Sequence, residues 1–384
     1  MTLYVVAAVP ALIWLYLLLA RGGFWRVSRQ FAPLPADHQL AKKVVVIIPA
    51  RNEAAVIGDA VRSLLQQDYG GSIHVVVVDD ASTDATHAAA IDAATSIGAT
   101  ARLSVITAAP LPPEWSGKVW AMSQGVLATL ELTPDYLLFT DADIRHERDD
   151  VAVLVTHAEA QGRDLVSCMV QLEAVSVADR LLIPAFVFFF LMLYPPAWIA
   201  APRSRVAAAA GGCMLIRPQA LGRIGGLQAI RSQIIDDCAL ARAVKAAGGS
   251  IWLGLTRAAR STRAYGSPFE IGRMISRSAF NQLHHSYALL AVTLAGLFCT
   301  FVLPVLLLLS TRPLSIALGV AAWMLMSLAY APMLRFYGLS VLWGLCLPAT
   351  ALFYAGATVH SAVQYALGRG GKWKGRIQDQ QLQR

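Results

Sequence analysis

Charged residues are very unevenly distributed along this chain of 384 residues. Residues 3–20 carry no charged side chain, and residues 286–366 carry only Arg312 and Arg335. Charged residues make up 15% of the chain, against about 25% in a typical soluble domain. The middle of the chain, 41–180 and 203–275, has the mixed composition of a water-soluble α/β domain. This division excludes a purely soluble enzyme and a channel made of helices alone.

The charge balance favours a membrane rather than a nucleic acid as partner. The chain has 32 Lys and Arg against 24 Asp and Glu, a formal charge of +8. Many of the basic residues flank the apolar stretches, where they mark the cytoplasmic face and attract anionic lipid. No basic stripe with interleaved aromatic residues occurs, so we expect no nucleic-acid partner. The five cysteines form no CxxC pair and are expected to be reduced thiols.

The apolar run at residues 3–20 predicts an N-terminal membrane anchor over residues 1–22. Its positive charges, Arg21 and Arg26, follow the run, whereas a cleaved signal peptide carries them before it. We therefore expect an uncleaved helix with its N-terminus outside and the following domain in the cytoplasm. This predicts a multi-pass protein of the inner (plasma) membrane.

Membrane-spanning helices are also predicted at the C-terminal end, over residues 286–368. The candidates are 287–310, 314–334 and 339–366, and a basic tail, 369–384, follows them. An anchor plus three spans would place this tail outside, whereas its charge favours the inside. A re-entrant segment at 339–366, broken at Pro348, would reconcile the two arguments.

A further apolar segment, residues 181–201, interrupts the soluble part. It contains Pro184, Pro195 and Pro196 and is flanked by arginines. A complete crossing here would place the two halves of the α/β domain on opposite sides of the membrane. We therefore expect an interfacial or re-entrant element that docks the domain on the bilayer.

Strand and helix patterns alternate through the domain that we predict for residues 41–282. Continuous β-branched runs predict buried strands, and helical patterns fall at about 54–67 and 119–130. This alternation predicts an α/β fold with a mostly parallel sheet and helices on both faces. Ligands of such sheets bind beyond the carboxyl ends of the strands. The predicted strands are 43–49, 74–79, 103–107 and 136–140.

Two pairs of acidic residues follow predicted strands. Asp79 and Asp80 end the second strand, where a carboxylate can bind a nucleobase or a ribose hydroxyl, or can cap the next helix. Asp141 and Asp143 follow the fourth strand, and two carboxylates on a turn can share a hard divalent cation with substrate phosphates. Such a cation offsets negative charge on a departing diphosphate. We expect both pairs to face one crevice.

Four other segments carry candidate groups with a simpler alternative. Lys118 begins a predicted helix and is either near a phosphate or a surface lysine. The small residues of 210–217 either line an acceptor pocket or form a tight turn. Asp236 and Asp237 precede a helix and are either helix caps or include a general base. Arg277 either neutralises a diphosphate or snorkels at the lipid surface.

Taken together, these motifs resemble the family 2 glycosyltransferases, which have the GT-A fold. The matching pieces occur in the family's order over roughly residues 43–282, and the apolar ends with WSGKVWAMSQG and KWKGR look closest to the hopanoid-associated branch. Neighbours of that branch are the carotenoid and ceramide glycosyltransferases. The matching pieces are VVVIIPARNEAAVIGDAVRSLLQQDY, VVVVDDASTDAT, GKVWAMSQG, LLFTDADIR, GGCMLIR and IDDCALARAVKAAGG.

The resemblance implies a role for each matching residue. Asp237 is at the position of the catalytic base, with Asp236 where the family usually has Glu. Asp141 and Asp143 would bind a Mg²⁺ or Mn²⁺ cofactor. The expected donor is a UDP-sugar. The expected contacts to this nucleotide sugar are Pro49, Arg51, Glu53, Asp79, Asp80, Lys118, Asp141 and Arg277.

The implied reaction is an inverting transfer of a sugar to a membrane lipid, in hopanoid or related isoprenoid lipid biosynthesis. Arg277 matches the arginine of the QxxRW motif of processive synthases, but Met274 and Ser278 replace its Gln and Trp. This departure favours single transfer over polymer synthesis. The alternatives are a processive polysaccharide synthase and a non-catalytic domain that recruits partners to the membrane.

Overall fold

The computed structural model describes residues 2–27, 31, 40–370, 372–373 and 376–377. The chain forms two compact units. We call Met1–Ser28, Ala174–Ala197 and Ala264–Gly371 the helical unit. We call Arg29–Glu173, Trp198–Arg263 and Lys372–Arg384 the sheet unit.

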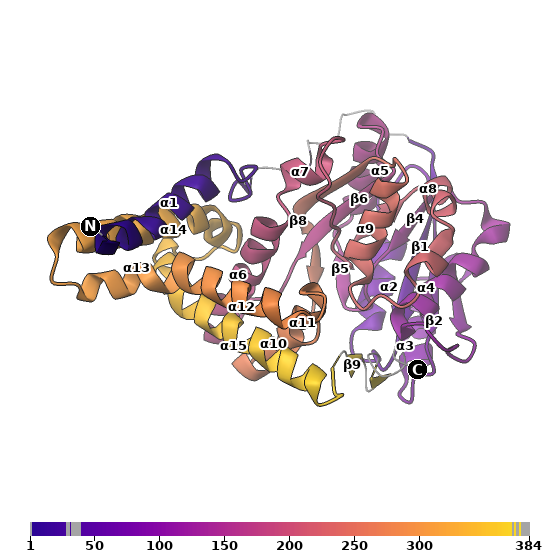
Figure 1. The fold of residues 1–384 in the computed structure, drawn as a ribbon. Helices are drawn as coiled ribbons and strands as arrows, with labels where there is room; N and C mark the ends of the chain where they lie inside the picture. The colour runs from indigo at the N-terminus through magenta and orange to yellow at the C-terminus, as the bar shows by residue number, and fades with distance from the viewer. Residues whose placement is uncertain (1, 28–30, 32–39, 371, 374–375, 378–384) are drawn as a thin grey trace. The chain divides into compact units, whose positions relative to one another are not determined.

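The sheet unit contains one large mixed sheet (Figure 1). Its strand order is β3-β2-β1-β4-β7-β6-β8-β5. Neighbours pair in parallel from β3 to β4 and between β6 and β8, whereas β7 and β5 run antiparallel to theirs. The strands are β1 (Lys43–Ala50), β2 (Ser72–Asp79), β3 (Leu103–Thr107), β4 (Tyr136–Phe139), β5 (Ile144–His146), β6 (Leu165–Gln171), β7 (Met214–Ile216) and β8 (Ile251–Ser261); the short β9 (Lys372–Trp373) and β10 (Arg376–Ile377) pair separately.

Helices cover both faces of the sheet (Figure 1). Val44, Val46 and Ile48 of β1 share a core with α2 (Ile57–Leu65), α3 (Thr86–Thr95) and α5 (Asp150–Ala160). Since side chains alternate along a strand, Ile47 points to the other face. There it meets α4 (Gly117–Ala128), where a Cβ on Gly125 would lie 2.5 Å from Ile47 Cγ2. The predicted mostly parallel α/β fold with helices on both faces is confirmed. The remaining short helices are α7 (Pro196–Ala200), α8 (Pro218–Arg223) and α9 (Asp236–Ala246).

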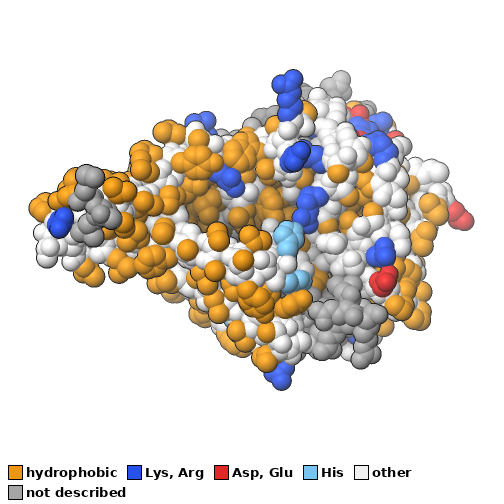
Figure 2. Space-filling model, viewed as in Figure 1, with side chains coloured by type: hydrophobic (Ala, Val, Ile, Leu, Met, Phe, Trp, Pro, Cys, Tyr) orange, Lys and Arg blue, Asp and Glu red, His pale blue; other side chains and the backbone are white. Residues whose placement is uncertain are grey.

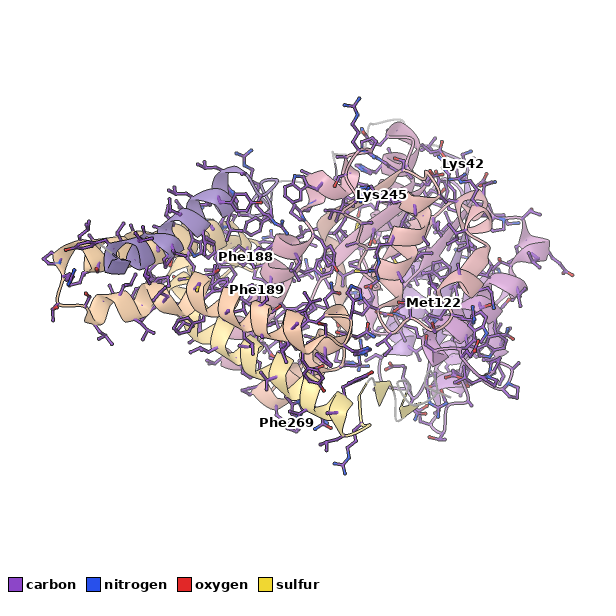
Figure 3. The ribbon with its side chains drawn as sticks, viewed as in Figure 1. Lys42, Met122, Phe188, Phe189, Lys245 and Phe269 are labelled. Atoms are coloured by element: carbon purple, nitrogen blue, oxygen red, sulfur yellow. The ribbon has the colours of Figure 1, made fainter. Side chains whose placement is uncertain are left out.

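Lys245 connects α9 to α7 and to the segment that follows α7. Its Nζ donates hydrogen bonds to the carbonyl oxygens of Trp198 (3.2 Å), Ile199 (2.7 Å) and Val206 (2.7 Å) (Figure 3). We expect Lys245→Met to lower the free energy of unfolding by about 2 kcal/mol, because three carbonyls lose their donor. Urea denaturation of the full chain in detergent measures this. Arg242→Met, an exposed position on the same helix, is the matched control, and an equal loss in both variants would contradict the expectation.

The helical unit is held together by aromatic side chains. Phe188 packs against Phe24 and Tyr330, and Phe189 packs against Phe301 and Tyr354; Figure 3 labels both phenylalanines. The helices are α1 (Thr2–Leu19), α6 (Val177–Leu193), α10 (Pro268–Ser276), α11 (Ala279–Gln282), α12 (Tyr287–Leu297), α13 (Leu303–Leu306), α14 (Pro313–Phe336) and α15 (Leu347–Ala366).

Three helical stretches of the described chain are long and apolar enough to cross a membrane: Tyr287–Leu309, Pro313–Phe336 and Val341–Ala366. Large apolar side chains stand exposed along them, for example Val292, Leu309 and Leu328 at 68%, 82% and 65%. Figure 2 shows hydrophobic side chains gathered over these helices. Such exposure is expected where lipid rather than water surrounds a helix. These stretches match the spans predicted from the sequence.

Two details of the membrane prediction look different in the structure. The apolar part of α1, Tyr4–Leu19, is shorter than the other three stretches, and the helix packs along α14 with Trp14 Nε1 donating to the carbonyl of Thr300. Pro348 does not break a helix, because it lies in the first turn of α15, which then continues to Ala366. The side of the membrane on which each terminus lies stays a prediction.

The apolar segment 181–201 folds into most of α6, followed by α7. Most of the α6 side chains are buried inside the helical unit, where the helix contacts α10, α14 and α15. Pro184 lies within α6, Pro195 lies between α6 and α7, and Pro196 is the first residue of α7. A docking role at the membrane interface stays a prediction for this segment.

Candidate active site

The first acidic pair lies at the end of β2. Asp79 and Asp80 are buried, at 8% and 2% exposure. Asp79 Oδ1 accepts a hydrogen bond from the Ser82 amide at 2.9 Å, and the Asp80 amide donates to the carbonyl of Ala50 at 2.8 Å. Helix α3 is capped at Ala85, so neither aspartate acts as its N-cap. The helix-cap alternative applies instead to Asp84 of the same segment, whose Oδ1 accepts from the Thr86 amide at 3.1 Å at the start of α3.

The loop after β1 packs against this pair. Pro49 is buried at the end of β1. Arg51 Nη1 hydrogen-bonds to the carbonyl of Asp80 and lies 3.8 Å from Asp80 Oδ2. The Glu53 amide donates to Thr86 Oγ1 at 2.8 Å. The predicted nucleotide contacts on β1 and β2 therefore occupy adjacent strand ends, as parallel pairing requires.

The turn at residues 141–143 follows β4 directly. Lys118, at the start of α4, lies with Nζ 2.8 Å from Asp141 Oδ1 and 3.5 Å from Asp236 Oδ2. Burial alone would lower the pKa of Lys118, but the charges of Asp141 and Asp236 outweigh it and raise this pKa. Lys118 is therefore a fixed ammonium that joins the turn to α9. Its reading as a plain surface lysine does not fit this position.

Asp237 is held in the first turn of α9. Its Oδ2 accepts from the Gly211 amide at 2.9 Å, and its Oδ1 accepts from the Cys238 amide at 2.6 Å. Burial and the neighbouring Asp236 carboxylate raise the pKa of Asp237 to about 6, although Lys118 acts against them. A carboxylate with such a pKa accepts a proton more readily than an ordinary aspartate near neutral pH.

Gly211 brings the backbone close to both charged groups. A Cβ at this position would lie 3.1 Å from Lys118 Nζ and 3.5 Å from Asp237 Oδ2. Residues 211–212 form a turn before β7, so the tight-turn reading of residues 210–217 holds. A role for this segment in lining an acceptor pocket stays a prediction.

Arg263 is a site residue that the sequence analysis did not identify. Its Nη2 lies 2.7 Å from Glu53 Oε2, and its Nε lies 3.4 Å from Asp143 Oδ2. Ser261 Oγ donates to the same Asp143 oxygen at 3.1 Å. Burial and the charge of Asp141 raise the pKa of Asp143, and Arg263 acts against them. In the sequence, Arg263 could have been recognised as a candidate because it follows a strand, β8, as other candidate residues follow β1, β2 and β4.

The donor set of the turn fits a hard divalent cation. Asp141 and Asp143 supply carboxylate oxygens, which Mg²⁺ and Mn²⁺ prefer. Each of these carboxylates contacts a basic side chain, Lys118 or Arg263. The turn at residues 141–143 therefore already attracts positive charge. Asp141 and Asp143 would also hold a divalent ion at this turn.

Two other features of the sheet unit do not include these acids. His146, Asp150 and Cys213 are fully buried and close enough to hold a metal, but His146 Nδ1 pairs with Asp150 Oδ2 at 2.6 Å and Nε2 with Thr140 Oγ1 at 3.0 Å. These bonds assign the group to the core as a structural network.

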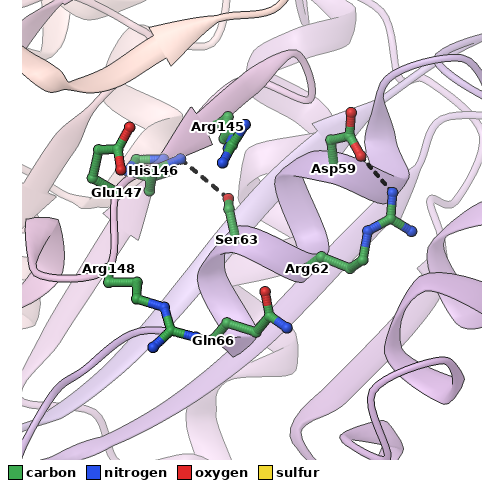
Figure 4. Close-up of a pocket in the computed structure, with 8 residues that line it drawn as sticks. All are labelled: Asp59, Arg62, Ser63, Gln66, Arg145, His146, Glu147 and Arg148. Atoms are coloured by element: carbon green, nitrogen blue, oxygen red, sulfur yellow. Dashed lines mark hydrogen bonds and ion pairs between the residues drawn. The ribbon is translucent and has the colours of Figure 1, made fainter.

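A pocket of about 220 Å³ lies beside α2 and β5 (Figure 4). It is lined by Asp59, Arg62, Ser63, Gln66, Arg145, His146, Glu147 and Arg148.

Arg277 belongs to the helical unit rather than to the sheet unit. It is exposed and forms the C-cap of α10. A contact of Arg277 with a diphosphate stays a prediction.

Comparison with known proteins shows which proteins this chain resembles. Residues 45–225 match the model of glycosyl transferase family 2. The 4,4'-diaponeurosporenoate glycosyltransferase of Staphylococcus aureus (strain bovine RF122 / ET3-1) is 36% identical over 122 residues, which are 32% of this chain and 29% of that protein. The protein of the same name from strain MRSA252 is also 36% identical over 122 residues, with the same coverage of both chains. The chain thus spans under a third of these relatives.

A solved structure shows the same fold over nearly the whole chain. The mannosyltransferase PcManGT from Pyrobaculum calidifontis, in complex with GDP-Man and Mn²⁺, superposes with a TM-score of 0.52 at 18% sequence identity. The match covers 95% of this chain and 98% of that one. The relatives named here give no support to the hopanoid branch that the sequence analysis singled out, since the curated ones act on a carotenoid. Residues 45–225 of this chain are therefore similar to glycosyl transferase family 2, and the chain has a GT-A-like fold.

Proposed function

We propose that this protein transfers a sugar from a nucleotide-sugar donor to an isoprenoid lipid in the membrane. The observation that carries the proposal is the contact of Lys118 with Asp141 on one side and Asp236 on the other. It joins a turn suited to a cation and a diphosphate to the helix that presents Asp237. A donor bound at the turn and an acceptor bound beside α9 would therefore lie next to each other.

In the proposed mechanism, Asp237 accepts the proton of an acceptor hydroxyl. The oxygen of that hydroxyl forms a bond to the anomeric carbon, the bond from this carbon to the diphosphate oxygen breaks, and the configuration inverts. Hydrogen bonds from Gly211 and Cys238 hold the Asp237 carboxylate in place. The ammonium of Lys118 lies near the developing charge of the leaving group. A Mg²⁺ or Mn²⁺ ion on Asp141 and Asp143 would add positive charge there.

The acceptor is proposed from the relatives and from the apolar helices. The named relatives are carotenoid glycosyltransferases, and the described part of this chain has three helices long and apolar enough to cross the bilayer in which such an apolar molecule would lie. Asp237 is useful only to an acceptor that must lose a proton, so we favour an isoprenoid alcohol over a carboxylate. A hopanoid alcohol, expected from the sequence, is one member of this class.

The basic residues around the apolar segments support a plasma-membrane location with the sheet unit in the cytoplasm. A donor that is made in the cytoplasm would then reach the site directly. Reporter fusions at both termini would test this topology, and a sheet unit found outside would contradict it.

Sugar transfer by the full chain in detergent tests the proposed function. UDP-glucose and GDP-mannose are offered with Mn²⁺ to hopanoid and carotenoid alcohols and to a carotenoid carboxylate. We expect one glycosylated lipid from at least one donor–acceptor pair. A ladder of longer products would indicate a processive synthase, and nucleoside diphosphate binding without any transfer would favour a recruitment role.

The rate of transfer is expected to depend on the ionisation of Asp237. Because the pKa of Asp237 is raised to about 6, its carboxylate becomes protonated as the pH falls through this value and can no longer accept a proton. We therefore expect kcat to rise with pH and to be half-maximal near pH 6. Asp236 and Lys118 face this group, so the profile is measured at saturating donor and Mn²⁺. A rate that is constant from about pH 5 to about pH 7 would contradict this role of Asp237.

A further inference from the structure

Arg263 connects two acidic side chains that come from different parts of the sheet. Glu53 follows β1, Asp143 lies in the turn after β4, and Arg263 follows β8. The guanidinium uses Nη2 for Glu53 at 2.7 Å and Nε for Asp143 at 3.4 Å. The backbone amide of Arg263 also donates to Ser261 Oγ at 3.2 Å. Ser261 and Arg263, at and just beyond the end of β8, both contact the carboxylate of Asp143.

The side chain of Arg263 is more exposed to solvent than the two acids that it contacts. The side chains of Glu53 and Asp143 are 12% and 19% exposed, whereas that of Arg263 is 40% exposed. The acids are thus fixed beneath a cation that reaches solvent. Lys118, which contacts the other acid of the turn, is 19% exposed and lies between two carboxylates. Of the two basic side chains, Arg263 is the more exposed.

A divalent cation on Asp143 would repel the guanidinium that already lies 3.4 Å from this carboxylate. A diphosphate that arrives with the cation offers oxygens that a guanidinium binds in a bidentate manner. Movement of Arg263 from the acids to the diphosphate would keep its charge paired in both states.

Building on the proposed function, we propose that Arg263 is an exchangeable counter-ion of the site. Without donor it neutralises Glu53 and Asp143, and with the metal-bound donor it binds the diphosphate. This role has a signature that a merely structural role lacks. Removal of Arg263 strengthens binding of the metal alone and weakens binding of the nucleoside diphosphate.

Binding measurements on the full chain in detergent test this signature. Mn²⁺ binding alone is followed by electron paramagnetic resonance, and binding of UDP and of GDP at saturating Mn²⁺ by calorimetry. We expect Arg263→Met to bind Mn²⁺ roughly threefold to tenfold more tightly, because a positive charge beside the ion is gone. We expect the affinity of Arg263→Met for the nucleoside diphosphate to fall by roughly tenfold or more, because a charged hydrogen-bond donor is lost. Arg263→Lys keeps the charge without the bidentate geometry and should lie between the two.

Arg260→Met is the matched control, because Arg260 is an exposed arginine near the end of β8 that donates to the carbonyl of Arg257. It should bind both ligands as the wild-type protein does. Unchanged affinities in Arg263→Met, or a parallel weakening of both, would overturn the counter-ion role while leaving the proposed function intact. If the wild-type protein binds neither UDP nor GDP with Mn²⁺, the proposed function fails and this inference fails with it.

Discussion

Replacement of Asp237 by Asn is expected to lower kcat for sugar transfer by roughly 10²- to 10⁴-fold, the usual contribution of a general base. The amide keeps the shape of the side chain and one oxygen acceptor, but it cannot take the proton of the acceptor hydroxyl. Binding of the nucleoside diphosphate should change little, because Asp237 faces the acceptor in the proposed mechanism. Initial rates with an isoprenoid alcohol, together with calorimetry of donor binding, measure the two effects separately.

Asp92→Asn is the control for this change, since Asp92 is an exposed residue of α3. Asp236→Asn is the informative comparison, because Asp236 is the neighbouring acid and contacts Lys118. If Asp236→Asn abolishes transfer and Asp237→Asn does not, the base is Asp236. If the rate with a carboxylate acceptor is high and indifferent to Asp237, the preference for an alcohol is wrong.

Replacement of Asp143 by Asn is expected to lower kcat/KM by roughly 10²-fold or more, because the cation beside the leaving group contributes several kcal/mol. Asp143 would supply one of the two carboxylates of the metal site, and a neutral amide is a much poorer ligand for a hard cation. Mn²⁺ binding should weaken in parallel. The measurements are kcat/KM over a range of Mn²⁺ concentrations and Mn²⁺ binding in the absence of donor.

Loss of Asp143 differs in kind from loss of Asp237. The Asp143 variant should recover part of its rate at high Mn²⁺, whereas the Asp237 variant should not. Asp149→Asn, an exposed acid shortly after the same turn, is the control. Metal-dependent transfer that survives unchanged in Asp143→Asn would remove this residue from the metal site.

Local sequence pattern predicted the fold well because it depends on burial. The runs of β-branched residues at β1 and β2 are fully buried strands, and such runs stay in the sheet whatever surrounds them. Boundaries were less accurate, since α2 covers Ile57–Leu65 rather than 54–67. Helix ends depend on capping contacts that the pattern does not contain.

The acids of the site were also visible in the sequence, because parallel strands bring their carboxyl ends to one edge of the sheet. The charge pairing of these acids was not visible. Arg263 lies 120 residues beyond Asp143 and follows β8, whose pairing with β6 no local pattern predicts. The raised pKa of Asp237 likewise depends on burial and on its distances from Asp236 and Lys118.

The membrane segments illustrate the same division. The length and composition of the three C-terminal stretches were sufficient to predict helices that can cross a bilayer. The packing of α1 along α14, and the hydrogen bond from Trp14 to the carbonyl of Thr300 between α12 and α13, required the tertiary structure. The sequence by itself thus determined which residues avoid water and where acids follow strands, because these depend on neighbours along the chain. Only the tertiary structure decided which charge meets which, because electrostatic energy depends on distances in space.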